Sequence, residues 1–160
     1  GVRASDEDNP RGYLEYEPVK NLRANSVWLM ESGGKYVKVI TQLLPFLRSG
    51  LDYRILYIER DLKEVMASQR KMLERSGKPG AAVSDDKLVD VFQKQIEQVK
   101  GIVEKSEIPT CYLDYRQTVE EPEKVARKMA RFLGEKFDIK NMAAAVDRKL
   151  YRQKTEELVS

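Results

Sequence analysis

The apolar residues of this chain follow two patterns, short continuous runs and a repeat every three or four residues, and these patterns predict its secondary structure. Residues 53–59 (YRILYIE) and 108–115 (IPTCYLDY) form short apolar runs, typical of strands that are covered on both faces. Residues 35–40 (KYVKVI), rich in β-branched and aromatic side chains, predict a third strand. Elsewhere apolar side chains recur every three or four residues, which predicts helices. The expected helices cover residues 17–33, 41–47, 61–74, 86–105, 118–133 and 141–150.

Strands therefore alternate with helices, which predicts an α/β fold. A helix between successive strands favours parallel pairing with right-handed crossovers. Three strands are few, since sheets usually hold about 4–6. Local signals mark the helix ends: Asp61 with Glu64, and Thr118 with Glu121, resemble capping boxes, and Gly134 suits a helix C-terminus.

Composition narrows the functions that this chain can have. It has 160 residues, 41% of them hydrophobic, which suits one domain with its own core. The net charge of +3 is small and both signs are mixed, which argues against a nucleic-acid-binding surface. Without histidine there is no Ser-His-Asp triad and no His-ligated metal, and the single cysteine, Cys111, is expected in the core. We expect no metal site.

Cysteine usage and hydropathy also predict where the protein acts. One cysteine allows no internal disulfide, which favours a reducing compartment, and we expect a cytoplasmic protein. No apolar run approaches the roughly 20 residues that span a bilayer, so no membrane partner is expected.

The strand-to-helix junction at Arg60 is the strongest candidate for chemistry. Ligands of open α/β sheets gather at the carboxyl ends of strands, where a helix N-terminus presents free N–H groups. Arg60 adds a planar donor fork that matches a phosphate group, and Ser68, two turns into the helix, adds a hydroxyl. Two interpretations stay open. Either these side chains bind an anion, or Arg60 pairs with Glu59 or Glu64 and Ser68 is a small packing residue.

The segment RDLKEVMAS at 60–68 resembles the 3′-phosphate-binding motif of the sulfotransferase superfamily. In that motif a strand is followed by Arg and then by Ser eight positions later. Leu62 departs from it, because many members have Pro there. Softer similarities to bacterial sulfotransferase-like proteins follow the same order along residues 9–151. They are NPRGYLE at 9–15 (NPxGYxE in the family), LDY at 113–115 with EP at 121–122, and FLG at 132–134.

The resemblance implies a fold, a cosubstrate and roles for individual residues. The fold would be a P-loop NTPase-like three-layer α/β fold with a mostly parallel sheet, and the cosubstrate 3′-phosphoadenosine 5′-phosphosulfate. Arg60 and Ser68 would hold its 3′-phosphate, and Tyr115 would lie near the nucleotide. Lys38 aligns with a strand lysine that approaches the transferring group; the alternative is an edge-strand lysine that reaches solvent. Ile40 stands where the family's catalytic histidine would follow, so a histidine mechanism is not implied.

A general base would then have to be a carboxylate. Glu15, within the NPRGYLE stretch, is the first candidate. An ordinary glutamate, with a pKa of about 4.3, is a weak base towards an alcohol unless it is desolvated. The alternative is that the acidic residues near the N-terminus form a solvated loop and a helix start.

The 160 residues contain no phosphate loop, neither GxxxxGKS/T nor the glycine-serine-threonine turn of sulfotransferases. In the family this loop follows the first strand and precedes the NPxGYxE region. We therefore expect one domain over residues 1–160 that is truncated at its N-terminus, lacks the first strand and is inactive by itself. The implied reaction is sulfuryl transfer to a hydroxyl or amine acceptor, either a small molecule or a carbohydrate.

Two other functions stay open at this point. The chain could be a non-catalytic protein-interaction module with a degenerate nucleotide site, which would use the amphipathic helix at 86–105. It could also be an ATP-dependent phosphoryl-transfer relative. An exposed sheet edge would favour self-association.

Overall fold

The computed structural model describes residues 12–75, 77, 84–134 and 136–151. The chain divides into two compact units. The first, the 3₁₀ unit, combines the residues up to Asp52 with Gln93–Glu107. The second, the sheet unit, combines Tyr53–Phe92 with the residues from Ile108 onward.

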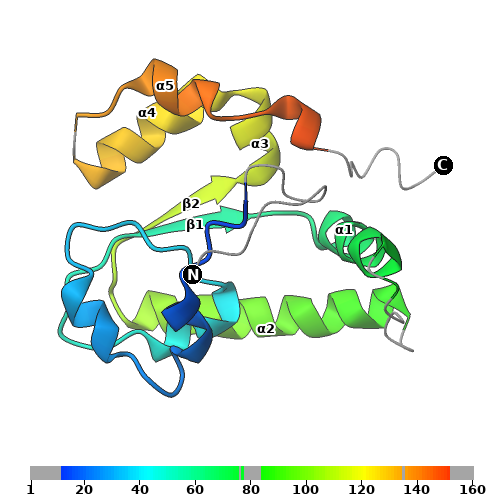
Figure 1. Cartoon of the computed structure of the whole chain (residues 1–160), viewed down its shortest axis with the longest axis horizontal. Coiled ribbons are helices and arrows are strands. Elements are labelled where there is room, and N and C mark those ends of the chain that lie inside the picture. Colours follow the sequence, from blue (N-terminus) through cyan, green and yellow to red (C-terminus); the bar gives the residue numbers. More distant parts are fainter. Residues whose placement is uncertain (1–11, 76, 78–83, 135, 152–160) are drawn as a thin grey trace. The chain divides into compact units, whose positions relative to one another are not determined.

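The sheet unit is built on two parallel strands, β1 (Ile55–Glu59) and β2 (Thr110–Asp114), which lie side by side (Figure 1). Their register pairs Ile55 with Thr110 and Glu59 with Asp114, so both strands end at the same level. The prediction of an α/β chain with parallel pairing is confirmed. Both strands lie where the apolar runs predicted them.

The core lies between one face of this sheet and helix α4 (Pro122–Leu133). Cys111 and Leu113 occupy alternate positions of β2 and therefore point to the same face. They pack with the fully buried Val125 of α4, and Leu56, Met129 and Phe132 surround them. The prediction that Cys111 is a core residue is confirmed.

Each strand leads into a helix through an acidic cap. Asp61 accepts backbone N–H bonds from Lys63 and Glu64 at the start of α1 (Leu62–Arg75). Asp114 accepts the backbone N–H of Gln117 at the start of α3 (Tyr115–Glu120). These caps satisfy N–H groups that the first helical turn leaves without partners.

Of the helix start predicted from Thr118 to Pro122, the cap at Thr118 is wrong and the start at Pro122 is confirmed. Its hydroxyl donates to the carbonyl of Asp114 at 2.6 Å, inside α3 rather than at a helix start. Asp114 provides an earlier cap, and Pro122, which has no N–H, interrupts the helix so that α4 starts there. The predicted end of α4 is confirmed, because Gly134 takes the left-handed conformation with φ of 73°.

The remaining helices are placed as follows. Helix α2 (Asp85–Lys105) confirms the amphipathic helix predicted at 86–105, and it contributes residues to both units. The single helix predicted at 141–150 is wrong, because α5 (Ile139–Ala144) and the 3₁₀ helix η4 (Arg148–Leu150) are separate. Figure 1 shows α4 and α5 on the same side of the strands.

The 3₁₀ unit departs most from prediction. The helix expected at 17–33 is two short 3₁₀ helices, η1 (Glu17–Asn21) and η2 (Val27–Glu31). Between them the side chain of Asn25 accepts the backbone N–H of Val27, a local bond that competes with a continuous helix. The turn predicted at 41–47 is confirmed as η3 (Thr41–Phe46).

The strand predicted at 35–40 is wrong, and Lys38 therefore does not lie in a strand. The only strand pair in the described part of the chain is β1 with β2. Residues 35–40 are not helical, but they form no backbone ladder. Among the described residues, no helix has the length and apolar content that crossing a bilayer requires.

Candidate anion-binding site at the strand ends

Parallel pairing brings Arg60 and Tyr115 together. Because Glu59 and Asp114 are paired at the ends of β1 and β2, the residues that follow them are neighbours too. The guanidinium carbon of Arg60 lies 4.6 Å from the centroid of the Tyr115 ring and 5.8 Å from that of Tyr151. The two tyrosine rings meet edge to face at 5.4 Å. This site lies wholly within the sheet unit.

A buried carboxylate completes the site. Glu64 is only 3% exposed, and its Oε2 accepts a hydrogen bond from Arg60 Nε at 3.3 Å. Its Oε1 accepts a hydrogen bond from the Tyr151 hydroxyl at 2.6 Å. We name these four residues, Arg60, Glu64, Tyr115 and Tyr151, the Arg60 cluster. The pairing of Arg60 with Glu64, one of the two interpretations of the sequence, is therefore present in the structure.

The electrostatics of the cluster follow from this geometry. Burial, followed by the hydrogen bond to the Glu64 carboxylate, raises the pKa of the Tyr151 hydroxyl to about 12. The Arg60 side chain keeps 24% of its surface exposed. Among the described residues its guanidinium makes one hydrogen bond, through Nε. The four N–H donors on Nη1 and Nη2 are therefore left for a ligand.

Ser68 lies further along α1 and is exposed. Ser68 lies one helical turn beyond Glu64, whereas Arg60 precedes the helix. The Ser68 hydroxyl forms no hydrogen bond with the described part of the chain. The structure thus brings Arg60 and Tyr115 together, but it does not place Ser68 in the Arg60 cluster.

Lys38 and Glu15, the two candidate catalytic residues, belong to the 3₁₀ unit and lie together. Lys38 Nζ is 3.9 Å from Glu15 Oε1 and donates a hydrogen bond to the carbonyl of Tyr13 at 3.1 Å. The Lys38 side chain is 54% exposed. An exposed pair of this kind contributes little to stability.

Sequence reasoning missed the role of Tyr151. The sequence pattern predicts Glu64 as part of a helix cap or as a partner of Arg60, and it gives Tyr151 no role. The available signal was an aromatic residue in an otherwise polar stretch, RKLYRQ at 148–153. The first residues of the NPRGYLE similarity, at 9–11, lie outside the described residues.

Comparison with protein-family models, with curated proteins and with solved structures finds no match for this chain. The class of protein is thus given by the structure alone. It is a mixed α/β protein with a small parallel sheet, and an arginine–tyrosine cluster lies at the carboxyl edge of that sheet. Within the described ranges, no group of three or more Cys, Asp or Glu side chains is arranged to hold a metal ion.

Proposed function

We propose that the Arg60 cluster binds the 3′-phosphate of an adenosine nucleotide, and that the chain belongs to a sulfotransferase-type protein. The observation that carries this proposal is the contact between Arg60 and Tyr115, whose ring centroid lies 4.6 Å from the guanidinium carbon. According to the motif similarity, Arg60 and Tyr115 contact the same bound nucleotide. They directly follow two different strands and meet at the carboxyl edge of the sheet, where ligands of open α/β sheets bind.

The chemistry of the site supports an anionic ligand. Arg60 precedes α1, whose N-terminus carries a partial positive charge. Arg60 lies over the rings of Tyr115 and Tyr151, and these contacts restrict its side chain, so less side-chain entropy is lost when a phosphate binds.

The proposal includes a P-loop NTPase-like three-layer fold. The parallel β1–β2 pair, with a helix following each strand, supports this proposed fold. A sheet of this kind usually has about 4–6 strands, of which the described residues supply two.

The proposed reaction transfers a sulfuryl group from 3′-phosphoadenosine 5′-phosphosulfate to a hydroxyl or amine acceptor, a small molecule or a carbohydrate, in the cytoplasm. The acceptor atom attacks sulfur, the bond from sulfur to the bridging phosphate oxygen breaks, and the acceptor loses its proton. The motif similarity, and no contact in the structure, assigns the charge on the departing phosphate oxygen to Lys38 and the proton to Glu15. Because the sequence has no phosphate loop, binding rather than turnover is the appropriate test.

The test is calorimetric titration of the chain with adenosine 3′,5′-bisphosphate and, separately, with ATP. Arg60→Lys keeps the charge beside Glu64 but removes the donor fork, and it should weaken bisphosphate binding by about tenfold. Ser68→Ala should also weaken it. The control is Lys63→Ala, which removes an exposed cation from the same helix and should leave affinity unchanged.

Three results would contradict the proposal. Equal affinity for ATP would favour the phosphoryl-transfer alternative. No binding of either nucleotide would favour the protein-interaction module. A loss of affinity in Lys63→Ala with none in Arg60→Lys would show that overall charge, not the donor fork, accounts for binding.

A further inference from the structure

Helix α4 carries a stripe of positive charge on its exposed face. Its other face is buried, with Val125 and Ala126 at 2% and 3% exposure. The cations repeat with the spacing i, i+3, i+4 and i+7, which places them on one helix face over about 10 Å. They are Lys124, Arg127, Lys128 and Arg131.

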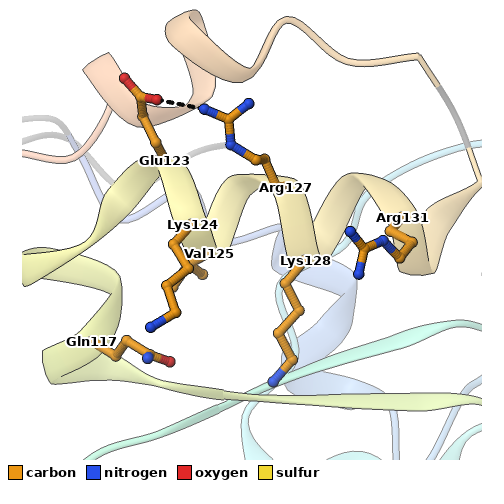
Figure 2. A pocket seen from close by; sticks show the side chains of 7 residues that line it. All are labelled: Gln117, Glu123, Lys124, Val125, Arg127, Lys128 and Arg131. Carbon is orange, nitrogen blue, oxygen red and sulfur yellow. Dashed lines mark hydrogen bonds and ion pairs between the residues drawn. The ribbon is translucent and has the colours of Figure 1, made fainter.

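This stripe lines a hollow of about 520 Å³, which we name the α4 groove (Figure 2). Besides the four cations, Gln117 from α3 and Glu123 contribute polar groups. Figure 2 shows Lys124 and Lys128 extending to the side where Gln117 lies, whereas Arg127 extends towards Glu123.

The four cations have few compensating charges. Arg127 pairs with Glu123 at 2.8 Å, and Lys124 pairs with Glu121 at 2.8 Å. Both are exposed pairs between neighbouring turns, which contribute little and can exchange partners.

The charges of the other two cations, Lys128 and Arg131, are not compensated by an acidic side chain in the described part of the chain. Lys128 donates to the backbone carbonyl of Tyr112 at 2.6 Å, which is a neutral acceptor. Arg131 forms no hydrogen bond or ion pair with any described residue. The α4 groove therefore keeps a net positive charge that its own acidic neighbours do not cancel.

An ordinary solvated helix face is the alternative explanation, and α2 shows what such a face looks like. Exposed acidic and basic residues alternate along α2, as at Asp86, Lys87, Asp90, Lys94 and Glu97. The exposed face of α4 carries cations only, apart from Glu123 in its first turn. Like charges at i and i+4 repel each other, so this clustering costs helix stability unless a ligand neutralises it.

We infer that the α4 groove binds a ligand carrying two or more phosphate or sulfate groups. A tetrahedral group presents oxygens in several directions, which suits donors that converge from two helices. Gln117 donates one amide N–H to Glu121 and has a second to offer. A single group would engage only one or two of the cations, whereas a stripe of about 10 Å suits several groups in a row. This inference does not depend on the Arg60 cluster.

The test is calorimetry of the full 160-residue chain with inorganic tripolyphosphate and with a heparin-derived hexasaccharide, the two sources of these groups. The double variant Lys124→Gln/Arg131→Gln should weaken binding by about tenfold and lower the salt slope of the heparin affinity by about 2. The matched control, Lys87→Gln/Lys94→Gln, removes the same charge with the same seven-residue spacing from α2. It should leave binding unchanged.

Polyglutamate, which carries planar carboxylates, is the comparison ligand. Weaker binding of polyglutamate supports the inference, and equal binding overturns it. Equal losses in the two double variants, or no loss in either, would also overturn it. Circular dichroism of each variant checks that α4 stays folded. Lys128→Gln, tested alone, should lower the same salt slope by about 1.

Discussion

The contact between Tyr151 and Glu64 should stabilise the sheet unit measurably. The substitution Tyr151→Phe removes one hydroxyl and keeps the ring, which meets Tyr115 edge to face at 5.4 Å. It leaves Oε1 of Glu64 without the donor that lies 2.6 Å away. Since Glu64 is only 3% exposed, water has little access to replace this bond.

The charge of the acceptor sets the size of the effect, because a hydrogen bond to a charged group contributes about 1.5–3 kcal/mol. We therefore expect Tyr151→Phe to lower the free energy of unfolding by about 2 kcal/mol at neutral pH.

The same bond predicts how stability depends on alkaline pH. The folded protein holds the Tyr151 proton more tightly than the unfolded chain does, because its pKa is raised. This stabilisation is complete below the unfolded value of 10.0 and is lost as pH rises through about 12. Urea unfolding of the wild type and Tyr151→Phe across this range should show the two free energies converging.

The control is Tyr115→Phe. Tyr115 contributes its ring to the cluster, and its hydroxyl makes no hydrogen bond with the described residues. We expect it to cost less than about 0.5 kcal/mol. The reasoning fails if Tyr151→Phe is no more destabilising than Tyr115→Phe, or if the wild type and Tyr151→Phe lose stability in parallel above pH 10.

Three further substitutions test the fold by urea unfolding. Asp114→Ala removes the cap that accepts the Gln117 N–H at 2.6 Å and should cost about 1 kcal/mol; no change would mean that α3 does not need this cap. Gly134→Ala forces alanine to a φ of 73° and should cost about 1 kcal/mol, whereas the control Gly33→Ala, at an open position, should cost less. Val125→Ala, at 2% exposure, should cost about 2 kcal/mol, and a loss below about 0.5 kcal/mol would argue against the core described for α4.

Apolar patterns in the sequence predicted a strand correctly only where the folded chain also provides a partner strand. The apolar runs at 53–59 and 108–115 became β1 and β2, because each has a partner in the other. The segment at 35–40 has the same preference for a strand but no strand beside it among the described residues. A ladder is a tertiary structure, so strand propensity alone cannot create one. The helix expected at 17–33 failed for a local reason, the Asn25 turn, which periodicity does not reveal.

Part of the Arg60 cluster could also be predicted from the sequence. Parallel pairing of the two strands is enough to expect Arg60 beside Tyr115. Tyr151 reaches Glu64 only through the packing of the chain after η4, which no sequence period encodes. The sequence analysis did not predict the α4 groove, because the small net charge of the whole chain gives no indication of a cluster of cations on one helix face.

Glu64 need not exclude an anion from Arg60. The described hydrogen bond to Glu64 uses Nε of the guanidinium, on one edge of its plane. The edge formed by Nη1 and Nη2 is the one that can bind a phosphate through two parallel bonds. One arginine can therefore neutralise a buried carboxylate and bind a ligand at the same time. Lysine has one ammonium group and cannot occupy both positions, and Arg60→Lys should therefore lose phosphate affinity even where it preserves the pair with Glu64.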